Sequence, residues 1–351
     1  MDFSFSRDQL LFQDNVRSFL INEVTPERIR ELWQSDSGRS EQLWAQLVEL
    51  GLTALTVPEA QDGMGMNELD FVLIAQECGY AGLPEPLVDT MLVGVPLLAA
   101  LDEQHAPLKQ KWLSRVAEGR ARLAVSEPGN PLVSDAHVAD LLLLAHGDEV
   151  HALERDAVRL TRNESVDPSR QLYQVEWTPT PDTCVASGEQ GRRLWAAAFN
   201  RGALASAAQL LGLAKRMVDL AVDYSFERKQ FGKPVGSFQA VKHLMANVAV
   251  QIEFAKGPLY RAAHAVAHNL PGQAVQVSHA KLACAEAAAL AAKNAIQVHG
   301  AMGYTWEVDL QLFMKRAWAL DKCWGDRGLH KARVRAALFD TGLAIGAGST
   351  F

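Results

Sequence analysis

Residues whose types could hold a ligand lie together in the stretch ERKQFGKPVGSFQ (227–239). Arg228 and Lys229 follow a helical pattern, and cations at a helix C-terminus commonly do no more than complement the helix dipole. The same stretch carries Phe231 and two glycines, and an arginine near an aromatic side chain can hold a phosphate beside a flat ring. The residues alone leave a ligand site and a plain helix connection equally open.

Two further stretches have the composition of ligand loops, and each also has a simpler structural explanation. QVHGAMGYTWEVD (297–309) places Gln297 at a helix end, followed by Gly300, which a glycine C-cap before a new helix would explain. A backbone without side chains can instead lie directly against a ligand. AVSEPGNPLVSDA (124–136) leaves a predicted strand and by itself indicates only a turn. Neither stretch alone identifies a function.

The sequence divides into three blocks with different patterns of apolar residues, and the elements that these blocks form would position the three stretches. Residues 1–118 have apolar residues at helical spacing, with Ser6 as a predicted N-cap, and predict an N-terminal helical domain. Residues 119–188 are short runs of β-branched and aliphatic residues separated by turns, which predict a small antiparallel β domain. Residues 189–351 hold long alanine-rich segments with short links, which predict a bundle of four long helices. The fold class is therefore mostly α with a small β domain.

Composition excludes several classes of function. The 351 residues carry a net charge of −7, whereas nucleic-acid binding depends mainly on basic patches, so we predict no nucleic-acid partner. The longest apolar candidate (90–101) is too short to span a bilayer and contains a proline, so we predict no membrane association. The four cysteines lie far apart without a CxxC pair, which favours reduced thiols in a cytoplasmic protein. His264 and His268 could face one side of a helix, but two imidazoles without a third ligand rarely bind a metal, and we predict none.

Together and in this order, the three stretches resemble the acyl-CoA dehydrogenase family, and the resemblance covers nearly the whole chain. SEPG…SDA is similar to the family's TEPGAGSD loop, and FSFSRDQLLFQDNVRSFL (3–20) is similar to the start of its N-terminal domain. ERKQFGKPVGSFQAVKHLMA and QVHGAMGYTWEVDLQLFMKRA resemble its most specific C-terminal motifs. The resemblance implies a helical domain, a β-barrel-like middle domain and a C-terminal four-helix bundle, with FAD at a subunit interface and an acyl-CoA substrate.

The resemblance also assigns cofactor contacts to positions of this sequence. In the family, the arginine of the RKQFG turn reaches the FAD pyrophosphate and the phenylalanine packs near it, which implies these roles for Arg228 and Phe231. The QxHGG-like run of the family lies along the adenosine side of FAD. The predicted cofactor-binding residues are therefore Arg228, Gln230, Phe231, Phe238, Gln239, Gln297, Gly300 and Ala301. These groups would serve a flavin held mostly by the neighbouring subunit.

The residue that would start the family's reaction is missing from this sequence. The usual reaction is α,β-desaturation of the thioester, in which a carboxylate removes the α-proton and flavin N5 takes the β-hydride. The glutamate of most members aligns with Trp324, and only Asp321 and Asp326 lie near it as weak candidates. A second group of members carries the glutamate near Gly202, but no Asp or Glu occurs from residue 190 to residue 218. We therefore predict that the chain has no catalytic base of its own.

The part of the sequence that would build its own flavin site also departs from the family. The SEP loop keeps Ser126, Glu127 and Pro128, but NPLV replaces the small residues before Ser134. The next strand motif of the family, K-x-W-I-T-N, has no counterpart, and ADLLLLAHGDEV stands in its place. The residues that would contact the FAD of a neighbouring subunit are thus kept, while the residues that would build a flavin site and a base in this chain are lost. This asymmetry resembles the non-catalytic subunit of heterotetrameric bacterial acyl-CoA dehydrogenases, including those that act on steroid CoA thioesters.

Two alternatives stay open at this point. The chain could be a self-sufficient homo-oligomeric dehydrogenase with Asp326 or Asp321 as an unusual base. It could also be a family member that has lost catalysis and serves as an acyl-CoA-binding scaffold. The paired-subunit hypothesis predicts a homologous acyl-CoA dehydrogenase chain as partner and FAD as the cofactor of the complex.

Overall fold

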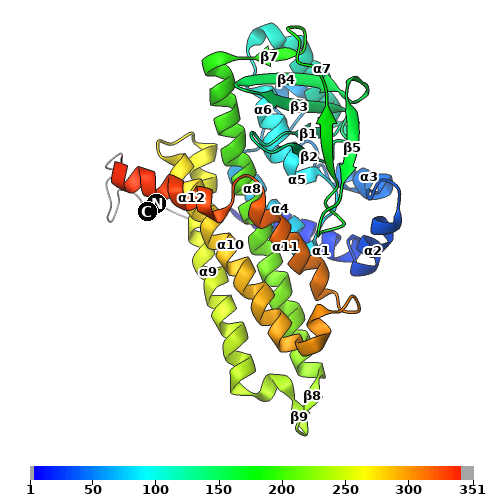
Figure 1. Ribbon diagram of the computed structural model, residues 1–351, viewed down its shortest axis with the longest axis vertical. Coiled ribbons are helices and arrows are strands. Elements are labelled where there is room, and N and C mark those ends of the chain that lie inside the picture. The colour runs from blue at the N-terminus through cyan, green and yellow to red at the C-terminus, as the bar shows by residue number, and fades with distance from the viewer. Residues whose placement is uncertain (1–3, 341–351) are drawn as a thin grey trace. The chain divides into compact units, whose positions relative to one another are not determined.

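The computed structural model of the chain describes residues 4–340 (Figure 1). The chain forms two compact units, each assembled from segments that are separate in the sequence. Unit 1 comprises the described residues of Met1–Pro26, Val72–Leu83 and Ser206–Phe351. Unit 2 comprises Glu27–Phe71 and Pro84–Ala205.

Unit 1 is helical. Its helices are α1 (Arg7–Glu23), most of α4 (Glu68–Ala81), the C-terminal part of α8 (Gly188–Glu227), α9 (Gln239–Ala267), α10 (Gln273–His299), α11 (Leu310–Lys322) and α12 (Arg327–Arg335), with the short helices η5 (Val235–Ser237), η6 (Gly300–Tyr304) and η7 (Ala336–Asp340). The predicted N-cap of α1 is confirmed, because Ser6 and Gln9 form a reciprocal capping box. α9 and α10 pack along one another (Figure 1). The predicted four long helices are three of 40, 29 and 27 residues, because a turn ends α11 after 13 residues.

Small residues let the helices of unit 1 approach closely. α10 buries a row of alanines, namely Ala280, Ala285, Ala287, Ala288, Ala291, Ala292 and Ala295. A Cβ added to Gly79 would lie 2.2 Å from the carbonyl oxygen of Gln209, and one added to Gly212 would lie 1.9 Å from that of Gln76. Within unit 1, α4 and α8 therefore touch backbone to backbone, which only glycine allows.

Unit 2 combines short helices with two small sheets. Its helices are α2 (Pro26–Gln34), α3 (Glu41–Glu49), η1 (Glu59–Gln61), α5 (Leu87–Asp89), the π-helix η2 (Thr90–Gly94), α6 (Val95–Ala99), η3 (Glu103–His105), α7 (Ala106–Ala117) and η4 (Arg155–Ala157). Its strands are β1 (Leu123–Val125), β2 (Leu132–Ser134), β3 (Leu141–His146), β4 (Glu149–Glu154), β5 (Arg159–Asn163), β6 (Leu172–Glu176) and β7 (Cys184–Ala186). The apolar run of β3 is buried and packs with residues of β2, β4 and β6 into one core cluster.

The sheets of unit 2 are ordered β1-β3-β4-β7 and β2-β6-β5. All pairs are antiparallel except β1 with β3, which are parallel with Leu123 opposite Leu141. The prediction of a purely antiparallel unit is therefore wrong at this pair. The physical reason is the path of the chain, since β2 is placed in the second sheet before the chain returns beside β1 in the same direction.

Two expectations from composition can be compared with the structure. Within residues 4–340, no helix has the length and apolar character needed to cross a bilayer. The four cysteines, Cys78, Cys184, Cys284 and Cys323, are free thiols. Burial raises the pKa of the Cys284 thiol to about 12, so this thiol stays protonated and packs as a small apolar side chain.

Candidate functional site

The motif at 227–239 forms a two-stranded hairpin between α8 and α9. β8 (Lys229–Gln230) pairs with β9 (Lys233–Pro234). Phe231 and Gly232 at its tip have φ values of +53° and +78°, the left-handed pair that a type I′ turn requires. A phenylalanine is rarely held at positive φ, and strain of this kind concentrates at functional sites. The Phe231 side chain is 91% exposed, so the turn presents an aromatic ring to the surface of unit 1.

Arg228 lies where α8 joins this hairpin. Its backbone is fixed, because its N–H donates to the Tyr224 carbonyl at 2.9 Å and its carbonyl accepts from Val235 N–H at 2.8 Å. Its side chain is exposed, and within residues 4–340 its guanidinium forms neither a hydrogen bond nor an ion pair. Arg228 thus offers a cation with five N–H donors on a fixed backbone, which suits a bidentate contact to a phosphate.

Aromatic rings and cations continue along the same turn. The Phe231 and Phe238 rings meet edge to face with centroids 6.1 Å apart, and Lys233 Nζ lies 4.4 Å from the Phe238 ring centre. Gln230 and Gln239 are both exposed beside them. The five predicted contact residues from 228 to 239 are therefore gathered on one small surface, which we call the Arg228 turn.

The second motif lies at the same end of unit 1. Gln297, Gly300 and Ala301 are exposed at the C-terminus of α10, where Gly300 has φ +63° and open space around its Cα. Tyr224 of α8 stacks on His299 of α10 with ring centroids 4.3 Å apart, and its hydroxyl donates to the His299 carbonyl at 3.4 Å. This contact joins the two motifs, so all eight predicted cofactor-binding residues lie on one end of the helical unit.

The Tyr224–His299 contact was missed in the sequence, although the histidine lies inside a motif. His299 Nδ1 lies 2.8 Å from the Ala295 carbonyl and burial lowers the pKa of the imidazole, so the ring is neutral and Nδ1 donates. The His299 ring is thus held by Tyr224 on one side and by the Ala295 carbonyl at Nδ1, and these two contacts fix the C-terminal end of α10. The sequence did contain one signal for this contact: Tyr224 lies four residues, or one helical turn, before Arg228 and so near the same end of α8.

Trp324, the residue at the expected base position, lies in a tight turn between α11 and α12. It has φ +54°, is followed by Gly325 at φ +89°, and is buried. Lys281 of α10 donates from Nζ to the carbonyls of Leu320 and Cys323 at 2.6 and 2.9 Å. His330 Nε2 lies 2.9 Å from the Trp324 carbonyl. Two buried side chains therefore fix this turn by its backbone, and no carboxylate takes the place of the indole.

The two aspartates beside this position have structural partners. Asp326 Oδ1 accepts from Leu329 N–H at 2.9 Å as the N-cap of α12, and this hydrogen bond lowers the pKa of its carboxyl. Asp321 Oδ1 pairs with Arg327 Nε at 2.9 Å. A base for a weakly acidic C–H proton works best with a pKa close to the operating pH, and the lowered pKa of Asp326 moves that carboxyl away from it. That the chain has no catalytic base remains a prediction.

The Arg228 turn and the Trp324 turn lie far apart in unit 1. Lys281, which donates to the Trp324 turn, and Ser278, which bonds to His330, belong to the N-terminal part of α10. The Arg228 turn is instead joined, through Tyr224, to His299 at the C-terminus of α10. The 18 residues from Lys281 to His299 span roughly 27 Å at 1.5 Å per residue. The surface that could hold a nucleotide and the position expected for the base therefore do not form one compact site in unit 1.

The third motif, SEPGNPLVSDA, lies in unit 2 and is tied into its first sheet. Ser126 N–H donates to the Leu143 carbonyl at 3.0 Å, and Ser126 Oγ accepts from Ala145 N–H at 2.8 Å. Further along, the Asp135 carboxylate forms a buried ion pair with Arg39. These contacts extend β1 along β3 and give the loop a structural role within unit 2.

A polar cleft of about 360 Å³ in unit 1 was not predicted from the sequence. Glu77 lies in it, pairs with Arg17 at 3.2 Å, and accepts from Gln13 Nε2 at 2.6 Å. Burial raises the pKa of the Glu77 carboxyl despite the arginine. Tyr80 donates to Asp219 at 2.8 Å in the same cleft. Because these polar groups pair with one another, we interpret the cleft as the site of a polar network that joins α1, α4 and α8.

His264 lies in the last turn of α9 and His268 directly follows the helix, and the two side chains do lie together as predicted. Their rings stack with centroids 4.2 Å apart, and His268 Nδ1 lies 2.9 Å from the His264 carbonyl. No third ligand accompanies them among the described residues.

Comparisons with known proteins agree with these motifs. The family description "Acyl-CoA dehydrogenase, N-terminal domain" matches residues 6–120, and "Acyl-CoA dehydrogenase, C-terminal domain" matches residues 189–339. The Acyl-CoA dehydrogenase IpdE2 of Mycobacterium tuberculosis is 32% identical over 312 residues, which is 88% of this chain and 91% of the relative. The chain belongs to the acyl-CoA dehydrogenase family. Its members are FAD-dependent oxidoreductases, so the chain is a member of an enzyme family of flavoproteins.

Solved structures of acyl-CoA dehydrogenases confirm the predicted fold class. The ChsE4–ChsE5 complex from Mycobacterium tuberculosis matches with a TM-score of 0.83 at 21% identity over 96% of this chain and 99% of that chain. The Tcur3481–Tcur3483 steroid ACAD matches with a TM-score of 0.85 at 21% identity over 96% and 99%. The acyl-CoA dehydrogenase fold, with many helices and small sheets, is therefore the fold of this chain.

Proposed function

We propose that this chain is the non-catalytic subunit of a hetero-oligomeric acyl-CoA dehydrogenase. In the complex it would complete the FAD site of a homologous catalytic subunit, and the complex would desaturate an acyl-CoA thioester between its α and β carbons. The observation that carries the proposal is the Arg228 turn, which presents a guanidinium without a partner among residues 4–340 beside an exposed aromatic ring.

The residues at this end of unit 1 fit a dinucleotide supplied from a partner. Arg228 suits a pyrophosphate, because a guanidinium binds phosphate oxygens through two parallel hydrogen bonds. Phe231 and Phe238 offer faces against which a flat ring can pack. At Gly300 no side chain blocks the approach of a ligand to the backbone. When bound, FAD supplies the hydride acceptor of the desaturation, and these side chains would hold its phosphates and adenosine.

The Trp324 turn supports the non-catalytic part of the proposal. Proton abstraction from a thioester requires a positioned base, and here a buried indole occupies the expected position. The nearby carboxylates of Asp321 and Asp326 pair with Arg327 and with the α12 backbone. Since the Arg228 turn is roughly 27 Å away along α10, its natural use is in a site completed by another chain.

The relatives support a bulky acyl group as the substrate class. One structural neighbour is a steroid ACAD, and another is a complex of two differently named chains, ChsE4 and ChsE5. We therefore propose a polycyclic or branched acyl-CoA thioester, with a homologous acyl-CoA dehydrogenase subunit as the partner.

Co-expression with homologous acyl-CoA dehydrogenase chains tests the proposal. The chain purified alone should be colourless, and the complex should show a flavin spectrum with one FAD for each pair of chains. Arg228→Ala should weaken FAD retention by about 10- to 100-fold, the effect of losing one charged bidentate contact, while assembly stays intact. Lys331→Ala is the matched control, because Lys331 is an exposed cation on α12 and should leave FAD binding unchanged.

Two results would overturn the proposal. A lone chain that is yellow and that an acyl-CoA bleaches would be a self-sufficient dehydrogenase, and loss of bleaching in Asp326→Ala or Asp321→Ala would identify its base. A lone chain that binds acyl-CoA, never acquires flavin and forms no complex with a homologue would be a scaffold.

A further inference from the structure

Three metal-ligating side chains in unit 2 share one face of the β3–β4 hairpin. His146 ends β3 and lies directly opposite Glu149 of β4, so both side chains point to the same side of the sheet. His151 follows two residues later on β4 and therefore points to that side as well. Only Gly147 and Asp148 separate the strands, and Gly147 at φ +61° makes this tight reversal possible. The register of the hairpin thus brings two imidazoles and a carboxylate together.

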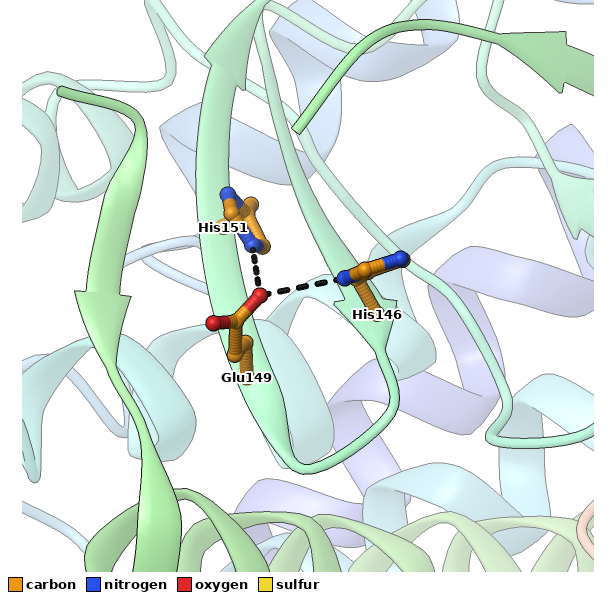
Figure 2. Close-up of side chains that lie close together, drawn as sticks. All are labelled: His146, Glu149 and His151. Carbon is orange, nitrogen blue, oxygen red and sulfur yellow. Dashed lines mark hydrogen bonds and ion pairs between the residues drawn. The ribbon is translucent and has the colours of Figure 1, made fainter. Parts of the chain in front are cut away.

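The three donor atoms converge on one point (Figure 2). Glu149 Oε2 lies 3.1 Å from His146 Nδ1 and 3.1 Å from His151 Nε2. All three donor atoms lie within 4.8 Å of one another. Ligands that share one zinc ion at the usual bond lengths lie roughly 3.3 Å apart, so only the two imidazoles must come closer. His146 is exposed at the hairpin end and can make this movement by rotating its side chain.

A neighbouring threonine contacts the far ring nitrogen of His151. Thr183 Oγ1 lies 2.9 Å from His151 Nδ1, 3.0 Å from the Thr180 carbonyl and 3.2 Å from Thr180 Oγ1. When Nδ1 donates to this hydroxyl, the lone pair of the neutral ring lies on Nε2, the atom that faces Glu149. A hydrogen bond to the far ring nitrogen is the arrangement that orients a histidine for a metal.

Two further contacts hold the donors in place. The Trp195 indole N–H donates to the Glu149 carbonyl at 2.9 Å, which anchors the strand at the carboxylate. The ring centres of Trp177 and His151 lie 4.9 Å apart, so the indole packs beside the imidazole. His151 is only 1% exposed, so its ring cannot turn away to solvent.

The geometry of the group suits one shared cation. A divalent cation among the three donor atoms, which lie within 4.8 Å of one another, would take a lone pair from each imidazole and from the carboxylate at once.

We propose that His146, Glu149 and His151 form a binding site for a divalent transition-metal ion of the Zn²⁺ class. Two imidazole nitrogens and one carboxylate oxygen are a donor set that zinc accepts, with water in the fourth position on the exposed side of His146. The ion would fasten the end of the β3–β4 hairpin and, through Thr183, the segment that leads into β7. This site is independent of the flavin-binding role proposed above.

Titration of the metal-stripped full chain with Zn²⁺ tests the site, followed by calorimetry and by the absorption of bound Co²⁺. One ion should bind per chain, with the visible spectrum of a four-coordinate cobalt site. His146→Ala and Glu149→Gln should each weaken binding by more than about 100-fold, and Thr183→Val by about 10- to 100-fold. Circular dichroism of each variant confirms folding, and His146→Ala is the least disruptive because its side chain is exposed.

The paired histidines of α9 provide the matched control. His264 and His268 are four residues apart and their rings stack, so they are a second pair of imidazoles that could compete for the ion. The double variant His264→Ala and His268→Ala should leave Zn²⁺ affinity unchanged. Binding that survives His146→Ala and Glu149→Gln, or that disappears in the α9 double variant, would overturn the proposal. So would the absence of any binding by the folded wild-type chain at micromolar Zn²⁺.

Discussion

A buried histidine beside the Trp324 turn predicts how the stability of the chain depends on pH. His330 is 0% exposed, and its two ring nitrogens lie 3.0 Å from Ser278 Oγ and 2.9 Å from the Trp324 carbonyl. Burial lowers the pKa of its imidazole from 6.5 to about 4. The unfolded chain therefore takes up a proton at this residue as the pH falls below 6.5, whereas the folded chain does not until about pH 4.

The magnitude follows from the difference between the two pKa values. Each pH unit between them changes the free energy of unfolding by about 1.4 kcal/mol at most. His330 therefore contributes stability above pH 6.5 that is lost as the pH falls toward 4, with a loss of about 2 kcal/mol between pH 7 and pH 5. Folding favours the neutral ring, so the sign of the effect is a loss of stability in acid.

Urea unfolding at a series of pH values measures this loss. His330→Gln removes the titrating group but keeps a hydrogen-bond donor for the Trp324 carbonyl. Between pH 7 and pH 5, the free energy of unfolding of wild type should fall by about 2 kcal/mol more than that of this variant. His268→Gln, at an exposed histidine, should follow wild type. Equal pH slopes for wild type and His330→Gln, or an NMR titration of His330 near pH 6.5, would refute the reasoning.

Three further changes test the packing of each unit. Lys281→Met should lower the free energy of unfolding by about 3–5 kcal/mol in urea titrations, because it removes two charged hydrogen bonds from a buried amine to the Leu320 and Cys323 carbonyls. Burial raises the pKa of Glu85 to about 7, so the folded chain keeps this carboxyl protonated at pH values where the unfolded chain does not. As the pH rises from 4.5 to 7, the free energy of unfolding of wild type should therefore fall by up to about 3 kcal/mol relative to that of Glu85→Gln. Gly212→Ala should lower the melting temperature, at a cost of about 1–3 kcal/mol, since its Cβ would lie 1.9 Å from the Gln76 carbonyl oxygen.

Local signals in the sequence predicted the features that depend on neighbouring residues. The N-cap at Ser6 follows from a serine three residues before a glutamine, and both capping hydrogen bonds form. The connection at 227–239 follows from its glycines and proline, and the hairpin there lies between two helices as expected. These features arise from hydrogen bonds within a few residues, so the sequence alone contains them.

Features that depend on distant segments could not be predicted in the same way. The parallel pairing of β1 with β3 depends on where β2 is placed, which no local pattern encodes. The left-handed backbone of Trp324 contradicts the preference of its residue type, and contacts from Lys281 and His330 hold the turn in which it lies. The donor group of His146, Glu149 and His151 depends on the register of a hairpin, although alternation along HGDEVH is a signal that could have indicated it.

The Trp324 turn also explains why restoring a carboxylate there would not restore a base. Trp324 is buried, its carbonyl lies beside His330, and Lys281 donates to the Leu320 and Cys323 carbonyls. A glutamate at this position would replace the indole in a buried turn where Lys281 already uses donors on the backbone and Arg327 pairs with Asp321. Its carboxyl would be driven to the neutral form by burial, and the cavity left by the indole would cost about 3–5 kcal/mol. The turn is therefore built as a structural element, as expected if the chain binds its ligand through the residues proposed at the opposite end of α10.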